Sequence, residues 1–388
     1  MTDMVFGNMA AKPGEPVLSH WWRTIDRWSM GAVFFLFCLG ILLAMAASPP
    51  LAERNGLPPF YYVTRQLVFG VTALAAMAIV SMLTPRQIRR WATIGFFAAA
   101  LAIALLPFFG TDFGKGAIRW YSFGFGSFQP SEFLKPAFVV FVAWLMSASH
   151  DIAGPPGKFI SFVVTAFLAF LLAMQPDYGQ AALILATWAV MYFVAGASLT
   201  LLVLFAGVSI SAAMFAYSAS EHVARRIDGF LISEVDPRTQ IGYATDAIRE
   251  GGFFGAGIGE GSVKWSLPDA HTDFIIAVAA EEYGLILCVV IIGLFLTITL
   301  RSMFRLVRER DTFVRIAGTG LAGLIGMQAI INMGVAVRLL PAKGMTLPFV
   351  SYGGSSLIAI GLLLGALFSL TRRRPQDDLG DYIGIARR

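Results

Sequence analysis

The residues best suited to chemistry lie in the stretch Pro268–Phe274, which reads Pro-Asp-Ala-His-Thr-Asp-Phe. This stretch ends the longest polar loop of a largely apolar chain, and apolar sequence carrying Glu281 follows it. Carboxylates at the rim of a bilayer are costly, so they commonly mark sites that handle charge or chemistry. Asp273 is therefore the leading functional candidate. Capping of the next helix by Asp269 and Asp273, with His271 as a surface residue, explains the same residues equally well.

A second polar cluster precedes another apolar run. Lys115 and Arg119 are followed by the segment Gln129–Lys135, in which Pro130 is well placed to begin a helix. Glu132 and Lys135 stand three residues apart, so they share a helix face and can pair. The three cations predict a phosphate-binding site that Glu132 orients. A structural ion pair at the end of a span is the alternative interpretation.

Two turns add polar or flexible positions. Asp177, in the turn Gln175–Gln180, can bind a cation or cap the following helix at its positive end. Glycines alternate along the segment Phe254–Ser262, but the strand–turn–helix context of a dinucleotide motif is missing. We therefore expect a flexible re-entrant turn near a substrate.

A glycine- and serine-rich segment, Gly344–Ser356, precedes the last apolar run. Ser351 and Gly353 within it indicate backbone packed tightly against another group. Arg338 and Lys343 lie just before it and add positive charge.

The composition sets the fold class. Of 388 residues, 57% are hydrophobic and 14% charged, against about 25% charged in soluble proteins. Apolar runs of about 18–22 residues recur, each long enough to cross a bilayer. The sequence thus predicts an all-α polytopic membrane protein. Two cysteines inside apolar runs and four scattered histidines predict neither a disulfide framework nor a zinc site.

We expect about ten spans and read them near 30–48, 63–83, 92–109, 131–147, 159–174, 180–195, 200–219, 273–299, 313–333 and 351–370. The proline pair after Ser48 is expected to end the first span. Most Lys and Arg residues flank one side, which predicts cytoplasmic N- and C-termini rather than nucleic-acid binding. Three parts follow: a cytoplasmic segment 1–29, one integral-membrane domain 30–370, and a basic cytoplasmic tail 371–388. Between spans seven and eight lies an extracytoplasmic loop, 220–272, with a short helix expected over Thr239–Glu250.

Taken jointly, these motifs resemble the SEDS family, the shape, elongation, division and sporulation proteins, over roughly residues 30–375. The anchors are Arg119-Trp120, Gln129-Pro130-Ser131-Glu132, Gln175–Gly179, Pro268–Phe274 with Glu281-Glu282, and Leu347–Ser356. The segment Lys343–Phe349 is more similar to the cell-division member than to its elongation paralogue.

The resemblance implies a peptidoglycan glycosyltransferase of the bacterial inner membrane, acting at the division septum on the extracytoplasmic face. Its substrate would be lipid II, a disaccharide-pentapeptide on undecaprenyl diphosphate, and its partners a class B penicillin-binding transpeptidase and other division-site membrane proteins. The family's essential aspartate falls on Asp273. Substrate-binding roles would fall on Arg119, Glu132, Lys135, Lys115, His271, Arg338, Lys343, Ser351 and Gly353, and supporting roles on Gln129, Asp177, Asp269, Thr272 and Glu281. A divalent cation, Mg²⁺ or Mn²⁺, is compatible with this chemistry, and no organic cofactor is expected.

The expected mechanism is a single inverting displacement in which Asp273 accepts the proton of the attacking 4-hydroxyl group. General-base help of this kind contributes about 10²–10⁴-fold. Cations would stabilise the diphosphate leaving group. Three alternatives stay open: a lipid II flippase, an elongation-type polymerase and a non-catalytic scaffold of the division site. A transporter would often show repeats or helices broken near the midplane, and the sequence shows neither convincingly.

Overall fold

The computed structural model describes residues 16–112, 118–124, 126–150, 154–196, 198–219, 239–341 and 344–373, together with Glu221, Ala224 and Asp228. Its helices are α1 (Val17–Thr24), α2 (Arg27–Arg54), α3 (Tyr61–Ser81), α4 (Pro85–Phe109), α5 (Pro130–Ala148), α6 (Gly157–Met174), α7 (Tyr178–Val194), α8 (Leu199–Ala219), α10 (Gln240–Gly251), α11 (Ile275–Leu306), α12 (Thr312–Ala336) and α13 (Gly354–Leu370). A two-stranded antiparallel hairpin, β1 (Tyr121–Ser122) and β2 (Ser127–Phe128), precedes α5.

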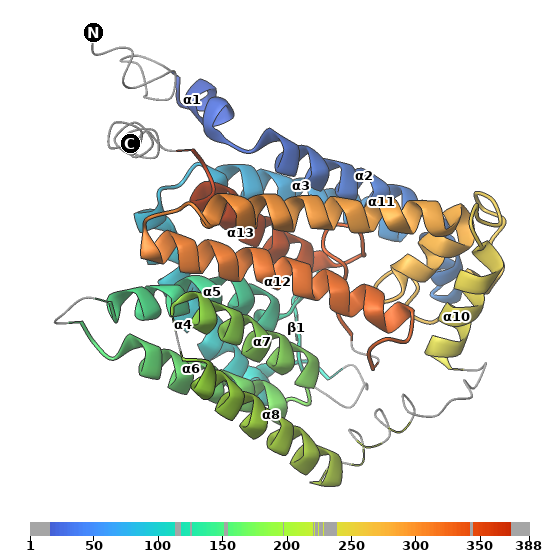
Figure 1. Ribbon diagram of the computed structural model, residues 1–388. Helices are drawn as coiled ribbons and strands as arrows, with labels where there is room; N and C mark the ends of the chain where they lie inside the picture. Colours follow the sequence, from blue (N-terminus) through green and yellow to red (C-terminus); the bar gives the residue numbers. More distant parts are fainter. Residues whose placement is uncertain are drawn as a thin grey trace.

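The long helices lie side by side in one bundle (Figure 1). Helix α13 packs mainly against α3, α5 and α12, while α12 also contacts α5, α7 and α11. Close approach of α13 to α3 depends on small residues: a Cβ atom at Gly365 would lie 2.7 Å from the carbonyl oxygen of Met77. The centre of the bundle is therefore formed by α5, α12 and α13, whose buried faces later prove to carry polar side chains as well.

Each of the ten predicted spans coincides with an apolar helix, from α2 to α8 and from α11 to α13. Seven of these are long and apolar enough to cross a membrane, and α7 and α13 are shorter apolar helices. The chain is thus an all-α multi-pass membrane protein. The number of crossings and the side on which each loop lies stay predictions.

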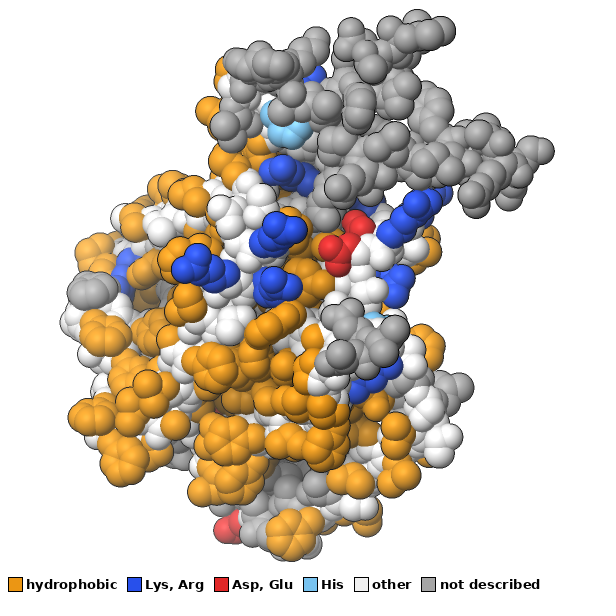
Figure 2. Space-filling model, turned by 90° about the vertical axis from the view of Figure 1, so that its left-hand side faces the viewer, with side chains coloured by type: hydrophobic (Ala, Val, Ile, Leu, Met, Phe, Trp, Pro, Cys, Tyr) orange, Lys and Arg blue, Asp and Glu red, His pale blue; other side chains and the backbone are white. Residues whose placement is uncertain are grey.

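The two ends of the bundle differ in charge. Helix α1 and the end of α13 lie at one end, and α10 with the loop that follows it lies at the other (Figure 1). Lys and Arg side chains gather on the end that carries α1 (Figure 2). Because basic residues are retained on the cytoplasmic side, this distribution favours the predicted orientation, with α10 outside.

The expected helix end at the proline pair is wrong. Helix α2 continues through Pro49 and Pro50 to Arg54. The two prolines remove only two backbone donors, and the helix bonds resume beyond them, with the Asn55 amide donating to the Leu51 carbonyl at 3.2 Å. The short loop helix, by contrast, is confirmed as α10, with the Thr239 side chain accepting from the Gly242 amide at its start.

Helix α11 is broken near its start. Gly284 has φ 75° and ψ −171°, a conformation open to glycine and strained for other residues. The buried residues Ile275–Glu282 precede the break, and the longer part of α11, in which most residues are at least partly exposed, follows it. A Cβ atom on Gly284 would collide with the backbone of Phe253 and Gly255. The break therefore lets the glycine-rich loop after α10 pack directly onto the beginning of α11.

Candidate functional site

Asp273 stands in a tight turn just before α11. Its amide and that of Thr272 both donate to the carbonyl oxygen of Asp269 at 3.1 Å, and Asp269 adopts the left-handed conformation with φ 53°. The N-cap position of α11 belongs to Phe274, which makes no side-chain cap bond. Neither acid is therefore the N-cap residue of α11, contrary to the capping alternative, and Asp273 is partly exposed at the end of the bundle.

The segment Gly344–Gly353 closes over this turn. Ser351 accepts a hydrogen bond from the Leu347 amide at 2.9 Å and donates to the Thr272 carbonyl at 2.5 Å. A Cβ atom added to Gly344 would lie 3.3 Å from Oδ2 of Asp273, so the carboxylate lies directly beside this glycine. The predicted tight packing of the glycine- and serine-rich segment is thus packing against the Asp273 turn itself.

Asn332 of α12 links the Asp273 turn to the segment Gly344–Gly353. Its Nδ2 atom donates to the carbonyl oxygens of Asp273 at 3.0 Å and of Met345 at 2.6 Å. Asn332 is buried, and among the described residues its Oδ1 atom has no hydrogen-bond partner. One amide side chain therefore fixes the position of the candidate base relative to the loop that covers it.

A second polar cluster is buried deeper, between α5, α7 and α12. Nζ of Lys135 lies 2.8 Å from Oε2 of Glu132, and both side chains are almost fully buried. Gln180 donates to Oε1 of Glu132 at 2.8 Å, and Lys135 donates to Oε1 of Gln328 at 3.2 Å. The predicted pairing of Glu132 with Lys135 is confirmed. Lys135 is 2% exposed, so its charge lies inside the bundle; the phosphate-site interpretation stays a prediction.

The two clusters are connected through α12. Gln328, which accepts from Lys135, also donates to the Thr346 carbonyl at 3.0 Å. Gln328 and Asn332 stand four residues apart and so face the same way along the helix. Together they form a line of hydrogen bonds from the buried ion pair to the loop segment and the backbone of Asp273.

Arg119 binds the turn before α7. It donates to the carbonyl oxygens of Gln175 at 3.2 Å and of Pro176 at 2.5 Å, and its Nη1 atom lies 4.0 Å from Oδ1 of Asp177. Asp177 occupies the N-cap position of α7, outside the helices. Burial raises the pKa of its carboxyl group, while the Arg119 charge acts in the opposite direction. Arg119 therefore fixes the turn before α7, close to the buried pair of Glu132 and Lys135.

Glu281 holds the glycine-rich loop. Its two oxygens accept from the amides of Val263 at 2.6 Å and Lys264 at 3.0 Å. The neighbouring acid, Glu282, pairs with the Lys264 side chain and accepts from the Gly259 amide at 2.8 Å. These contacts make Glu281 a supporting residue that anchors the loop onto α11, and they give the loop a fixed path instead of the expected flexible one.

The remaining predicted residues take various places. The backbone amide of Gln129 donates to the Ser355 hydroxyl at 3.2 Å, and Gly353 is the N-cap residue of α13. Arg338 follows α12 with φ 59°. The Gln240 side chain donates to Oδ2 of Asp269 at 3.4 Å. The His271 ring lies among aromatic rings. Lys115 and Lys343 lie outside the described residues.

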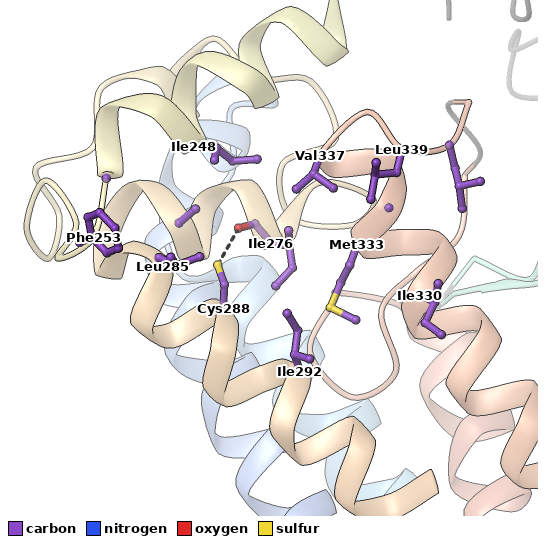
Figure 3. A pocket seen from close by; sticks show the side chains of 14 residues that line it. Ile248, Phe253, Ile276, Leu285, Cys288, Ile292, Ile330, Met333, Val337 and Leu339 are labelled. Atoms are coloured by element: carbon purple, nitrogen blue, oxygen red, sulfur yellow. Dashed lines mark hydrogen bonds between the residues drawn. The ribbon is translucent and has the colours of Figure 1, made fainter. Parts of the chain in front are cut away.

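An apolar groove of about 720 Å³ lies between α10, α11 and α12, and its side chains converge on the space between these helices (Figure 3). Ile276 on its wall stands three residues after Asp273, and Met333 follows Asn332. The groove lining and the Asp273 turn therefore use neighbouring positions of the chain, and the apolar lining is suited to a hydrocarbon chain.

The sequence reasoning missed Gln328 and Asn332. A signal was present, because two amides spaced four residues apart in an otherwise apolar span are costly unless they bond to a neighbour. It also gave no role to Tyr62 and Tyr352, which become neighbours of His271 only when three distant segments meet.

Fold and site together define a multi-pass helical membrane protein that holds an acid between two loops at the end of its bundle that carries α10, and that has an apolar groove between α10, α11 and α12. The family of cell cycle proteins that groups FtsW, RodA and SpoVE matches residues 27–376. The chain belongs to this family, the SEDS proteins, and within it is FtsW-like.

Individual relatives support this family assignment. A probable peptidoglycan glycosyltransferase FtsW from Caulobacter vibrioides is 42% identical over 94% of both chains. One from Trichlorobacter lovleyi is 38% identical over 86% of this chain and 90% of its own. Among solved structures, a chain of a peptidoglycan synthase complex that coordinates polymerization and crosslinking has a TM-score of 0.72 and 27% identity, covering 89% of this chain and 97% of its own. The rod shape determining protein RodA of Thermus thermophilus has a TM-score of 0.66 and 25% identity, covering 90% and 97%.

Proposed function

We propose that the chain polymerises lipid II into glycan strands for septal cell-wall synthesis, with Asp273 as the general base. The enzyme class is that of its FtsW relatives, peptidoglycan glycosyltransferase. The observation that carries the proposal is the position of Asp273, which is held by two loops and stands three residues along the chain from Ile276, a lining residue of the apolar groove. A substrate with a polyprenyl tail and a polar sugar head needs both features at one place.

The chemistry follows from this position. The 4-hydroxyl group of the acceptor sugar gives its proton to the Asp273 carboxylate as its oxygen bonds to the anomeric carbon of the donor. The bond from that carbon to the diphosphate oxygen breaks, and undecaprenyl diphosphate leaves with the bonding electrons. One displacement inverts the anomeric carbon, so an α-linked donor gives a β-linked glycan. The polyprenyl tail would lie in the groove beside Ile276 and Met333.

The leaving diphosphate needs positive charge near Asp273. Arg119 and Lys135 bind the turn before α7 and Glu132. Arg338 and Lys343, which both precede the covering loop Gly344–Gly353 in sequence, are further candidates for this charge. Among the described residues no group of three His, Cys, Asp or Glu side chains is placed to hold a metal ion. A divalent cation would thus take most of its ligands from the diphosphate and water, as Mg²⁺ often does.

The proposal includes a place and a partner. The polar end with α10 would face the extracytoplasmic side of the bacterial inner membrane, where undecaprenyl-linked sugars are used. A class B penicillin-binding transpeptidase would crosslink the product, in line with the related complex that coordinates polymerization and crosslinking.

The test is polymerisation of labelled lipid II by the purified chain with its transpeptidase partner. Asp273→Asn should abolish product while the variant stays folded and partner-bound. Gln240→Ala, which removes only a 3.4 Å contact to Asp269, is the matched control and should remain active. Full activity of Asp273→Asn would end the general-base assignment.

A lipid flippase is the second candidate, because α11 is broken at Gly284 and broken helices occur in transporters. The break lies only nine residues into α11, at the polar end of the bundle, whereas transporter sites lie near the midplane. Translocation of lipid II in vesicles without polymer formation would favour this second function.

A further inference from the structure

Three aromatic rings from separate segments meet beside the candidate base. Tyr62 comes from α3, His271 from the turn before α11, and Tyr352 from the covering loop; we name them the aromatic triad. The ring centroids of Tyr62 lie 5.6 Å from His271 and 5.4 Å from Tyr352, and those of His271 and Tyr352 lie 5.5 Å apart. All three residues are partly exposed, so the cluster reaches the surface.

The triad is held in place by polar contacts. The Asn55 side chain donates to the Tyr62 hydroxyl at 2.8 Å, and the Tyr352 amide donates to the His271 carbonyl at 2.8 Å. Burial raises the pKa of the Tyr352 hydroxyl, so this group stays protonated and able to donate a hydrogen bond at neutral pH. The rings therefore form a fixed surface with polar groups at its edge.

The triad and the apolar groove flank Asp273 in the chain. His271 stands two residues before Asp273, and Ile276, on the groove wall, stands three residues after it. Ser351, next to Tyr352, bonds to the carbonyl of Thr272. A reacting molecule at Asp273 thus has aromatic faces toward α3.

The chemistry of the rings suits a sugar. Aromatic faces carry negative charge density and ring edges positive, and a pyranose presents a face of C–H groups with slight positive charge. Tyrosine combines such a face with a hydroxyl that can bond to sugar oxygens. The simpler explanation, that the rings only pack the two loops onto α3, accounts for the centroid distances but not for the exposure of all three residues next to the acid.

We propose that the aromatic triad is a carbohydrate subsite that binds a pyranose ring of the glycan substrate against Tyr62, His271 and Tyr352. This subsite rests on the proposed function, since it supplies the sugar contact that a polymerase needs next to its base. Its ligand class is a β-1,4-linked N-acetylhexosamine chain, presented either by the growing polymer or by the lipid-linked disaccharide.

Ligand binding is tested apart from turnover. The probe is a soluble β-1,4-linked N-acetylglucosamine tetrasaccharide, added to the full chain in complex with its partner. Saturation-transfer NMR should show contact in the native protein and in Tyr352→Phe, and loss of contact in Tyr352→Leu. Tyr192→Leu, which removes a ring stacked on Trp188 at 4.6 Å on α7, is the matched control and should bind as the native protein does.

Kinetics separate binding from folding. Tyr62→Leu and Tyr352→Leu should raise KM for lipid II about tenfold, equivalent to about 1.4 kcal/mol, with a smaller effect on kcat, and the phenylalanine variants should restore most of it. If KM rises but tetrasaccharide binding is kept, the triad binds the sugar of lipid II. If KM rises and tetrasaccharide binding is also lost, the triad binds the glycan polymer as well. Unchanged KM and unchanged binding in a folded leucine variant would overturn the subsite.

A further measurement covers leucine variants that fail to fold. With 3-fluorotyrosine at position 352 of the otherwise native chain, the ¹⁹F resonance should shift as tetrasaccharide is added, and no shift up to saturation of the native protein would overturn the subsite. If the protein bound the sugar yet made no polymer from lipid II, the polymerase function would fail while the subsite stood. If polymerisation depended on Asp273 but not on the triad, the polymerase function would stand and the subsite would fail.

Discussion

Removing one partner of the buried ion pair should destabilise the protein more than removing both. In Lys135→Met, Glu132 keeps its 2.8 Å hydrogen bond from Gln180 but loses its countercharge inside the bundle. Breaking a buried pair in this way costs about 3–5 kcal/mol. In the double variant Glu132→Gln, Lys135→Met, no charge is left, and Gln328 loses one donor, which costs about 1–3 kcal/mol.

The assay is equilibrium unfolding in mixed micelles with increasing denaturing detergent, run on the native protein, both single variants and the double variant. The interaction energy expected from this double-mutant cycle is about 3 kcal/mol or more, because each single variant costs about 3–5 kcal/mol and the double variant only about 1–3 kcal/mol. Lys158→Met, at the start of α6 and only half-buried, is the control and should change stability by about 0.5 kcal/mol or less. If the double variant lost as much stability as the two single variants combined, the two residues would not stabilise each other and the reasoning would be refuted.

Three more predictions follow from single contacts. Gly344→Ala places a Cβ atom 3.3 Å from Oδ2 of Asp273 and should lower the polymerisation rate at least about tenfold, because small displacements of a catalytic group are costly; single-turnover kinetics check this, and a native rate would contradict it. Asn332→Leu removes the hydrogen bonds to the Asp273 and Met345 carbonyls and should lower kcat while KM for lipid II holds; an unchanged kcat would remove its positioning role. Asp26, at the other end of the bundle, is buried, which by itself raises its pKa. The hydrogen bonds from Arg301 at 3.0 and 3.1 Å, the Arg305 charge and the Ser29 hydrogen bond together outweigh burial and hold the pKa below its ordinary 3.8. The stability from this pair is present above pH 3.8 and is lost as the pH falls through the lower folded pKa. The unfolding midpoint of Asp26→Asn should therefore decrease less with falling pH in the acid range than that of the native protein. An equal decrease in both proteins would show that the pair contributes nothing.

Most of the fold was predictable because a membrane imposes one strong rule. Apolar runs of sufficient length become helices, since backbone groups in lipid must bond within their own segment, and every predicted span coincides with a helix. The proline pair at Pro49 was misjudged because proline removes only local bonds, and helix α2 continued for four residues beyond it. The break at Gly284 was invisible in the sequence, because a single glycine in an apolar run does not reveal which loop will pack against it.

The candidate site was predictable in part. Asp273, Thr272 and Ser351 were found from their motifs, and the structure brings them together. The role expected for Arg119 and Lys135 depended on where long side chains point, and both turn toward partners inside the bundle or in a neighbouring turn. Such choices depend on the tertiary packing of several helices, which spacing along one helix cannot specify.

The line of hydrogen bonds from Lys135 through Gln328 to the covering loop raises the question of why the chain buries such costly groups. A buried ion pair is weak evidence for stability, and its best-attested use is to fix one arrangement among several. The Asp273 turn and the covering loop have few helical bonds of their own, so Gln328 and Asn332 supply fixed attachment points on α12. If the double variant at Glu132 and Lys135 unfolds near the native midpoint but no longer polymerises lipid II, the pair serves to position the base rather than to hold the bundle together. If it retains both stability and activity, the line of bonds carries no positional information, and Asn332 alone must locate Asp273.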